Sequence, residues 1–274
     1  MACHTPQVVQ QTPAPKTPVQ PTQPKPYAET NALYQQQVQK YAERLSQTPL
    51  IDTFGLAQPP FWVGTVNFNM RRPNFVIIHH TAQTSCEQTL KTFTLQRTQV
   101  SAHYVICEDG TVHHMLDDML RAWHAGAGRW GNITDINSIS IGIELDNDGK
   151  EPFAEAQMNS LLQLLTNLKK AHSIPTANFI GHADIAPTRK DDPSVYFDWK
   201  RLADNGFGHW YSETTDDLPA DFNPSMALRL IGYDMRDTTA VQTVFKRKYL
   251  KKVDFRPLTE SDKKVLWQVA RKFW

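Results

Sequence analysis

The chain has 274 residues, enough for one good hydrophobic core and a second, smaller unit. Its 29 basic and 28 acidic residues give a net charge of +1, which argues against a nucleic-acid-binding protein because no broad basic face is available. No apolar run approaches membrane-spanning length, so we expect no helix that crosses a bilayer.

Residues 4 to about 30 consist mainly of Gln, Thr, Pro and Val. Such a segment cannot bury enough apolar surface to offset its ordering entropy, so it predicts a flexible, extended tether. Met1-Ala2-Cys3 precedes the tether and resembles the processed start of a bacterial lipoprotein, whose cysteine carries lipid. The alternative is a free cysteine on a disordered tail.

The segments that follow predict strands interspersed with helices, which is typical of an α/β domain built on one mixed central sheet flanked by helices. The clearest helix is residues 154–172, where five apolar side chains share one face. Ser85 and Gln88 form a helix-start pattern. A further helix is expected at 28–47, and strands are expected at 75–78, 103–107, 111–114, 137–146 and 178–180.

After Trp199 the pattern changes to an aromatic loop at 206–211 and then to three short helices at about 224–231, 239–249 and 260–272. Pro224 suits a first helical position, and Thr259 with Asp262 can cap the last helix.

Three polar side chains in one loop indicate a metal-binding or catalytic site. The loop 181–193 follows a short apolar strand, crosses Pro187 and offers His182, Lys190 and Asp192. Imidazole and carboxylate are ligands that zinc accepts, and a catalytic zinc leaves its fourth position to water. A third ligand must come from elsewhere, and His79, at the end of the strand that begins at Phe75, is the best candidate.

Glu144 lies in a segment, 138–145, that alternates small or polar residues with apolar ones. Taken alone, a histidine after an apolar run is more often packed than metal-bound, and a strand-end carboxylate is usually only solvated. Together these segments resemble the zinc-dependent N-acetylmuramoyl-L-alanine amidases of the type 2 amidase family, which includes the peptidoglycan recognition proteins. The resemblance rests on His79 to Ala82, Ser101 to Tyr104, Asp109-Gly110, Ala122 to Gly126, Asn137 to Glu144, Gly181-His182, and Lys190 to Pro193, in the family's order.

The resemblance implies one Zn²⁺ per chain, held by His79, His182 and Asp192. It implies that Glu144 is the catalytic carboxylate, moving a proton from water to the leaving amine, and that Lys190 stabilises charge on the carbonyl oxygen. The expected substrate is peptidoglycan or a muropeptide, cleaved between N-acetylmuramic acid and L-alanine.

Several other residues have less definite roles. His80 is expected to be structural, and His113-His114 to be strand surface. The three cysteines show no C-x-x-C spacing; Cys86 and Cys107 either pair or remain free thiols. Side chains that could contact substrate, or support the site or the core edge instead, are His103, Trp123, His124, Trp130, His209 and Trp210.

We therefore expect a tether (1–30), an amidase domain (31–220) with the fold of the peptidoglycan recognition proteins, and a three-helix module (221–274). That module resembles in arrangement the peptidoglycan-binding module often attached to these amidases; a helical extension packed on the main domain is the alternative. The expected protein is a monomeric lipoprotein on the periplasmic face of the outer membrane. A recognition protein that binds cell wall without cleaving it, and a cytosolic enzyme for anhydro-muropeptides, are the competing readings.

Overall fold

The computed structural model describes residues 27–47, 55, 57, 62–212 and 217–274, and the chain divides between Val66 and Asn67 into two compact units. In the first unit, helix α1 (Ala28–Ser46) confirms the helix predicted at 28–47, and none of its side chains is buried. Cys3 and the predicted tether lie almost wholly outside the described residues. Among the helices that are described, none combines the length and apolar character that spanning a bilayer requires.

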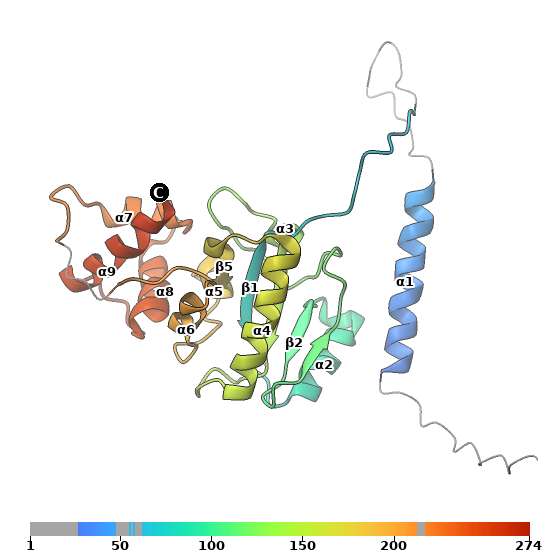
Figure 1. Ribbon diagram of the computed structural model, residues 1–274, viewed down its shortest axis with the longest axis horizontal. Helices are drawn as coiled ribbons and strands as arrows, with labels where there is room; N and C mark the ends of the chain where they lie inside the picture. The colour runs from blue at the N-terminus through green and yellow to red at the C-terminus, as the bar shows by residue number, and fades with distance from the viewer. Residues whose placement is uncertain (1–26, 48–54, 56, 58–61, 213–216) are drawn as a thin grey trace, which may run out of the picture. The chain divides into compact units, whose positions relative to one another are not determined.

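A mixed five-stranded sheet lies at the centre of the second unit, as predicted (Figure 1). Its strand order is β3-β2-β4-β1-β5. β1 runs parallel to both β4 and β5, β2 runs parallel to β4, and β3 pairs antiparallel with β2. The strands are β1 (Phe75–His80), β2 (Tyr104–Ile106), β3 (Val112–His114), β4 (Ser140–Leu145) and β5 (Phe179–Gly181).

Two local predictions need correction. Residues 137–139 are not strand but part of a one-turn helix, α3 (Ile136–Ile139), because the Ser140 hydroxyl donates to the Ile136 carbonyl and closes a turn there. The sequence predicts a loop at 181–193, yet this segment begins with another single turn, α5 (His182–Ile185). This turn is fixed by the Asp184 side chain, which accepts a hydrogen bond from the Gly181 amide. The short helix α6 (Trp199–Asp204) was not predicted.

Alternation along β1 divides its side chains between the two faces of the sheet. Val76 and Ile78 pack with the apolar stripe of α4 (Glu155–His172) in one hydrophobic cluster. Phe75 and Ile77 belong to a second cluster on the other face. His79 continues the second set, and its partner in the parallel neighbour β4 is Glu144. The sheet therefore delivers both side chains to the same face.

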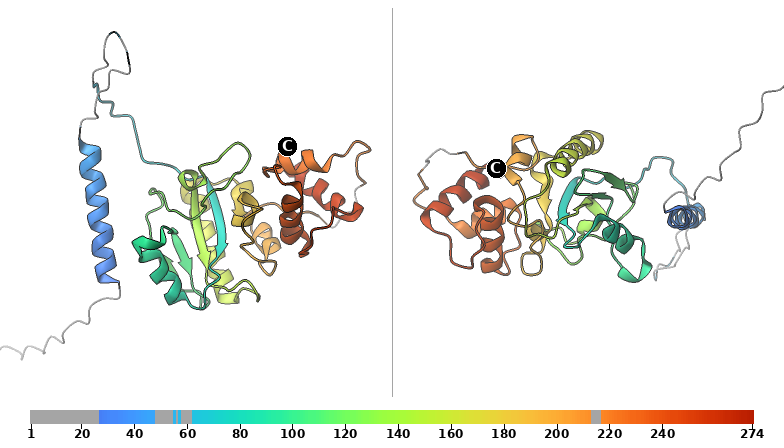
Figure 2. Two further views of the ribbon diagram at one scale, coloured as in Figure 1. Left: turned by 180° about the vertical axis from the view of Figure 1, so that it is seen from behind. Right: turned by 90° about the horizontal axis from the view of Figure 1, so that it is seen from below.

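The three C-terminal helices lie next to α5 and α6, on the β5 side of the sheet, and their buried apolar side chains belong to the second cluster (Figures 1 and 2). They are α7 (Pro224–Ile231), α8 (Thr238–Leu250) and α9 (Glu260–Ala270), close to the predicted ranges. Pro224 occupies the first turn and Thr259 with Asp262 forms a capping box, as predicted. Because these helices share a core with β1 and β5, the structure favours an extension packed on the main domain; cell-wall binding by residues 221–274 stays a prediction.

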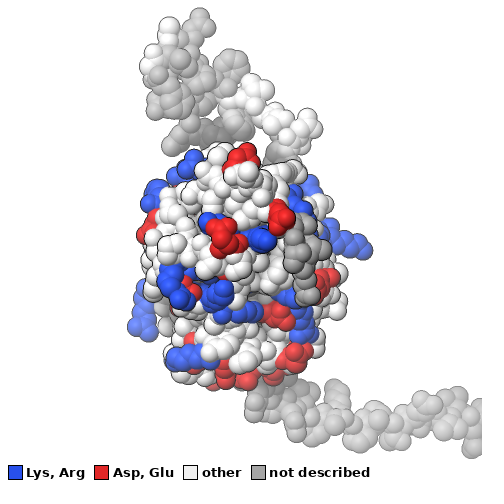
Figure 3. Space-filling model, turned by 90° about the vertical axis from the view of Figure 1, so that its left-hand side faces the viewer, with Lys and Arg blue, Asp and Glu red and all other residues white. Residues whose placement is uncertain are grey.

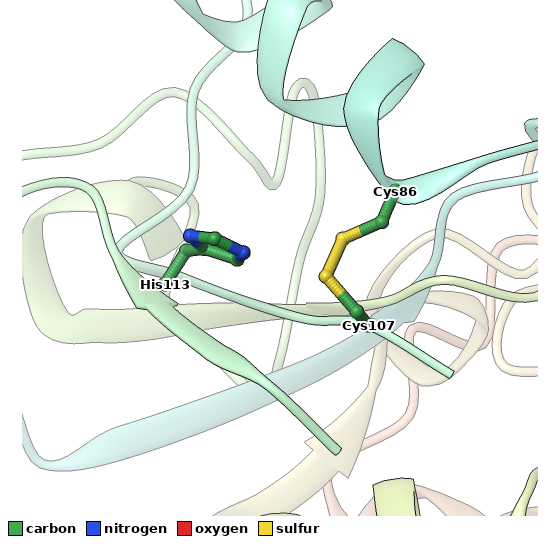
Figure 4. Close-up of side chains that lie close together, drawn as sticks. All are labelled: Cys86, Cys107 and His113. Carbon is green, nitrogen blue, oxygen red and sulfur yellow. A yellow bond between two sulfur atoms is a disulfide. The ribbon is translucent and has the colours of Figure 1, made fainter. Parts of the chain in front are cut away.

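Cys86 and Cys107 form a disulfide, which resolves the alternatives left open by the sequence (Figure 4). It joins the first residue of α2 (Cys86–Thr94) to the residue that follows β2. The Ser85 hydroxyl caps α2 by accepting from the Gln88 amide, as the sequence predicted.

We expect reduction of this disulfide to lower the free energy of unfolding by about 3 kcal/mol, because the bond closes a loop of 21 residues in the unfolded chain. Urea unfolding with and without a dithiol reductant measures the effect. The double variant Cys86→Ser/Cys107→Ser is the control and should not respond to reductant. Equal unfolding free energies for the oxidised and reduced wild type would contradict the prediction.

Candidate active site

Three predicted ligand side chains meet at the carboxyl ends of β1 and β5. His79 is the fifth residue of β1, His182 directly follows β5, and Asp192 lies ten residues further along the loop. Each is at most 6% exposed. The His79 Nδ1 lies 2.9 Å from the His182 Nδ1 and 3.1 Å from the Asp192 Oδ2, and the His182 Nδ1 lies 3.0 Å from the same oxygen.

The His182 ring is oriented by a backbone carbonyl. Its Nε2 lies 3.0 Å from the Ala125 oxygen, which can only accept, so Nε2 carries the proton. In a neutral imidazole the other nitrogen then has a free lone pair. The Nδ1 that faces Asp192 is therefore available as a ligand.

A longer chain of hydrogen bonds fixes the tautomer of His79. The Ser140 hydroxyl donates its only hydrogen to the Ile136 carbonyl, so toward the His124 Nε2, 3.1 Å away, it acts as acceptor. His124 consequently has its proton on Nε2 and accepts at Nδ1 from the His79 Nε2, 3.1 Å away. The proton of His79 is thereby placed on Nε2, and its Nδ1 lone pair faces the other two ligands.

Burial keeps this histidine chain neutral. Burial, followed by the nearby His182, lowers the pKa of His79 to about 4. Burial and the neighbouring His79 also hold the pKa of His124 well below its usual range. Each ring therefore carries one proton at neutral pH, which is the condition that the hydrogen-bond chain requires.

The donor set fits a zinc ion. Two imidazole lone pairs and a carboxylate oxygen converge within 3.1 Å with no hydrogen left to share among them, so they repel one another unless a cation lies between them. Tetrahedral zinc with bonds of about 2.0–2.1 Å places neighbouring ligand atoms roughly 3.3 Å apart, close to the spacing here. Catalytic zinc sites also use two histidines and one carboxylate, with a fourth position left for water.

Glu144 lies beside the ligand cluster and not within it. Its Oε1 is 3.9 Å from the His79 Nδ1, and the residue is 9% exposed. Burial and the Asp192 carboxylate raise the pKa of Glu144 to about 8, while the Lys190 ammonium opposes that shift. Lys190 is half-buried, on the loop that joins α5 to Asp192. The structure thus brings together all five predicted catalytic and metal-binding residues.

The predicted substrate contacts divide by exposure. Trp123 directly precedes His124 and is 48% exposed. Trp130 is buried against Tyr233 and Gly232, while Trp210 packs on Tyr249 of α8. These two tryptophans therefore support the joint with the C-terminal helices.

The three remaining histidines of interest have protein partners. His103 is fully buried, and its Nδ1 accepts from the Gly142 amide, which favours a scaffold role. His209 lies partly exposed against the Phe273 ring. His80 accepts from the Ser194 amide and so supports the backbone just after Asp192, in agreement with the structural role predicted for it.

A second group of candidate ligand side chains occurs among the described residues, formed by Cys86, Cys107 and His113 (Figure 4). Its two sulfur atoms are bonded to each other. Zinc binds cysteine as thiolate, so this group is not a metal site while the disulfide is intact.

Known proteins resemble this chain in sequence and in fold. Residues 69–195 match the family described as N-acetylmuramoyl-L-alanine amidase. The N-acetylmuramoyl-L-alanine amidase AmiD of Escherichia coli is 36% identical over 155 residues, which cover 51% of this chain and 55% of AmiD. The 1,6-anhydro-N-acetylmuramyl-L-alanine amidase AmpD of Haemophilus influenzae is 39% identical over 104 residues, 38% of this chain and 56% of AmpD. The chain thus spans somewhat more than half the length of these relatives.

Two solved structures share the fold. AmiD of E. coli, in complex with the substrate anhydro-N-acetylmuramic acid-L-Ala-D-gamma-Glu-L-Lys, matches with a TM-score of 0.66 at 25% identity, over 79% of this chain and 95% of that one. AmpDh3 of Pseudomonas aeruginosa matches with a TM-score of 0.67 at 25% identity, over 82% and 98%. The likeness extends well beyond residues 69–195, the part of the chain that matches the N-acetylmuramoyl-L-alanine amidase family.

Proposed function

We propose that this chain is a zinc-dependent N-acetylmuramoyl-L-alanine amidase that removes stem peptides from peptidoglycan or muropeptides. The observation that carries the proposal is the convergence of three proton-free ligand atoms, from His79, His182 and Asp192, beside the buried carboxylate of Glu144. The similarity to AmiD, whose solved complex holds a muropeptide, supports the choice of substrate.

His79, His182 and Asp192 would hold the zinc, which when bound polarises the scissile carbonyl and lowers the pKa of a water molecule. Glu144 takes a proton from the attacking water and delivers it to the nitrogen of L-alanine as the amide bond breaks. The water oxygen becomes part of the carboxylate left on the lactyl group, and the peptide leaves with a free amine.

The charges around Glu144 suit this proton transfer. Burial favours the protonated carboxyl that must donate to the amine, and Lys190 favours the carboxylate that must accept from water. A group that serves as base and then as acid must reach both its charged and its neutral form. A pKa of about 8 keeps both forms of Glu144 within reach near neutral pH. We further propose that Lys190 stabilises negative charge developing on the carbonyl oxygen.

Trp123 is the exposed aromatic residue that we propose as a substrate contact. Its backbone amide donates to the Ser101 hydroxyl, which anchors the loop, and its ring remains half-exposed. An aromatic face of this kind can pack on a sugar ring or an apolar stretch of peptide.

Zinc analysis together with a muropeptide digest tests the proposal. We expect one zinc per chain by elemental analysis, and mass spectrometry should show free stem peptide with an amino-terminal L-alanine. Zinc binding together with muropeptide binding, but without cleavage, would instead support a recognition protein. Failure to bind zinc would overturn the proposed mechanism.

For location we propose the cell envelope, with lipid on Cys3 anchoring the enzyme through the predicted tether. The motivating observation is the sequence Met1-Ala2-Cys3 followed by an uncharged Gln- and Pro-rich start to the tether. An extended chain spans up to about 3.3–3.6 Å per residue, so the tether would let the enzyme reach cell wall beyond the membrane surface.

We therefore expect the native precursor to fractionate with membranes and the Cys3→Ser variant to become soluble. Immunoblots of membrane and soluble fractions measure this, with Cys86→Ser as the control that removes a cysteine elsewhere. Wild-type protein confined to the soluble fraction would contradict the anchor.

A further inference from the structure

A buried carboxylate underlies the turn that carries the His182 ligand. Asp184 is 1% exposed and lies two residues after His182 in α5. Its Oδ2 accepts from the Gly181 amide, 2.7 Å away, which closes the turn around His182. The other partners of this carboxylate come from α8 and from the segment that precedes it, not from the amidase motifs.

Lys248 of α8 supplies the countercharge. Its Nζ lies 2.6 Å from the Asp184 Oδ2, and the residue is 8% exposed. The same ammonium lies 4.1 Å from the centroid of the Trp199 ring. Lysine and arginine are common on the surface of the C-terminal helices (Figure 3), whereas Lys248 is enclosed. A buried ion pair tolerates little displacement, because separation leaves both charges without solvent or partner.

Tyr233, in the segment between α7 and α8, completes the arrangement. Its hydroxyl donates to the Asp184 Oδ1 over 2.7 Å, and the residue is 3% exposed. Both oxygens of Asp184 are therefore held by residues beyond position 220. A carboxylate with all partners fixed in this way can orient the turn that it caps.

The same turn also positions the third ligand. The Ala183 amide, between His182 and Asp184, donates to the backbone carbonyl of Asp192 over 2.8 Å. Movement of α5 would therefore displace both His182 and Asp192 relative to His79, which belongs to the buried strand β1.

We propose that Lys248 and Tyr233 are positioning residues for the metal ligands, so that the C-terminal helices are a structural part of the zinc site. This inference rests on the proposed function in assuming that zinc is the cation. Removal of a single partner that orients a metal ligand typically lowers metal affinity roughly 10- to 100-fold.

The experiment compares Lys248→Met with Lys246→Met. Lys246 lies on the same helix, is 1% exposed, and pairs with Asp254 at 2.5 Å, within the C-terminal segment and away from α5. Zinc affinity is measured by chelator competition on the full chain. We expect Lys248→Met to weaken affinity 10- to 100-fold and Lys246→Met to stay within a few-fold of wild type.

Hydrogen exchange at the Gly181 amide gives a readout that needs neither metal nor activity. In the zinc-free protein, exchange at this amide should accelerate in Lys248→Met and not in Lys246→Met, because the Asp184 carboxylate that accepts from it loses its countercharge. Tyr233→Phe removes a single hydroxyl and provides the same two readouts with a smaller effect, should Lys248→Met not fold.

Unchanged affinity and exchange in Lys248→Met, or in Tyr233→Phe where that variant stands in for it, would overturn the inference. Equal losses in Lys248→Met and Lys246→Met would overturn it too, since they would indicate general destabilisation. Failure of the wild type to bind zinc would refute the proposed function, while the exchange measurement would still decide whether Lys248 orders α5.

Discussion

Replacing His182 with alanine is expected to abolish both stoichiometric zinc binding and amide hydrolysis. The variant removes one of three converging ligand atoms and leaves two, His79 Nδ1 and Asp192 Oδ2. Two ligands at a buried site do not replace the hydration shell of a divalent cation, so affinity should fall by several orders of magnitude. Elemental analysis after dialysis and the release of stem peptide by mass spectrometry measure the two losses.

His172→Ala is the matched control for loss of a buried histidine. His172, the last residue of α4, is 7% exposed and hydrogen-bonds to Asp118. Its carbonyl accepts from Arg72, just before β1, so it lies at the opposite end of the sheet from the ligands. This variant should lose stability and keep one zinc per chain. Zinc retained at one per chain in His182→Ala would show that the ligand assignment is wrong.

The positions of His79 and Glu144 could be predicted because short-range patterns determine them. Each occupies a defined place in an apolar strand, and alternation along a strand decides the face on which a side chain lies. The sequence does not show that β1 and β4 are neighbours in register; the family resemblance implies only that His79 and Glu144 serve the same site. The structure gives the pairing of His79 with Glu144 directly.

The hydrogen-bond chain that orients His79 could not be predicted in the same way. It joins His124 and Ser140 to His79 from three segments of the chain, and nothing local in the sequence indicates that they meet. His124 was considered as a supporting residue or a substrate contact, and its burial and bonds favour the first. The strand predicted at 137–146 gives no sign of the role of Ser140, because it lacks the turn, α3, whose carbonyl accepts from the Ser140 hydroxyl.

The partners of Asp184 were also missed, although the sequence contains a signal. Val241, Val244, Phe245 and Lys248 lie at helical spacing, so the apolar face of α8 includes a lysine at a core position. A lysine at such a position requires a buried acceptor. The sequence leaves Trp130 and Trp210 open as substrate contacts for a related reason: it does not show that helices α7 to α9 cover them.

Replacing Glu144 should separate metal binding from chemistry. Glu144→Gln keeps the size and hydrogen-bonding capacity of the side chain and removes its ability to accept a proton. We expect the variant to retain one zinc per chain, because the carboxylate lies 3.9 Å from the His79 Nδ1, outside the cluster of three ligand atoms that lie 2.9–3.1 Å apart.

Turnover should nevertheless fall by roughly two to four orders of magnitude, the usual contribution of a general base, which corresponds to about 3–5 kcal/mol of transition-state stabilisation. Single-turnover digestion of a muropeptide, followed by mass spectrometry, measures the loss. Glu151→Gln, an exposed glutamate that follows the same strand, is the control and should retain wild-type turnover. Loss of zinc together with activity in Glu144→Gln would make Glu144 a ligand or a support for the ligands, while undiminished turnover would assign the proton transfer to another group. Zinc retained with turnover reduced to this extent would identify Glu144 as the group that moves the proton, because the metal, its three ligands and Lys190 would all be unchanged.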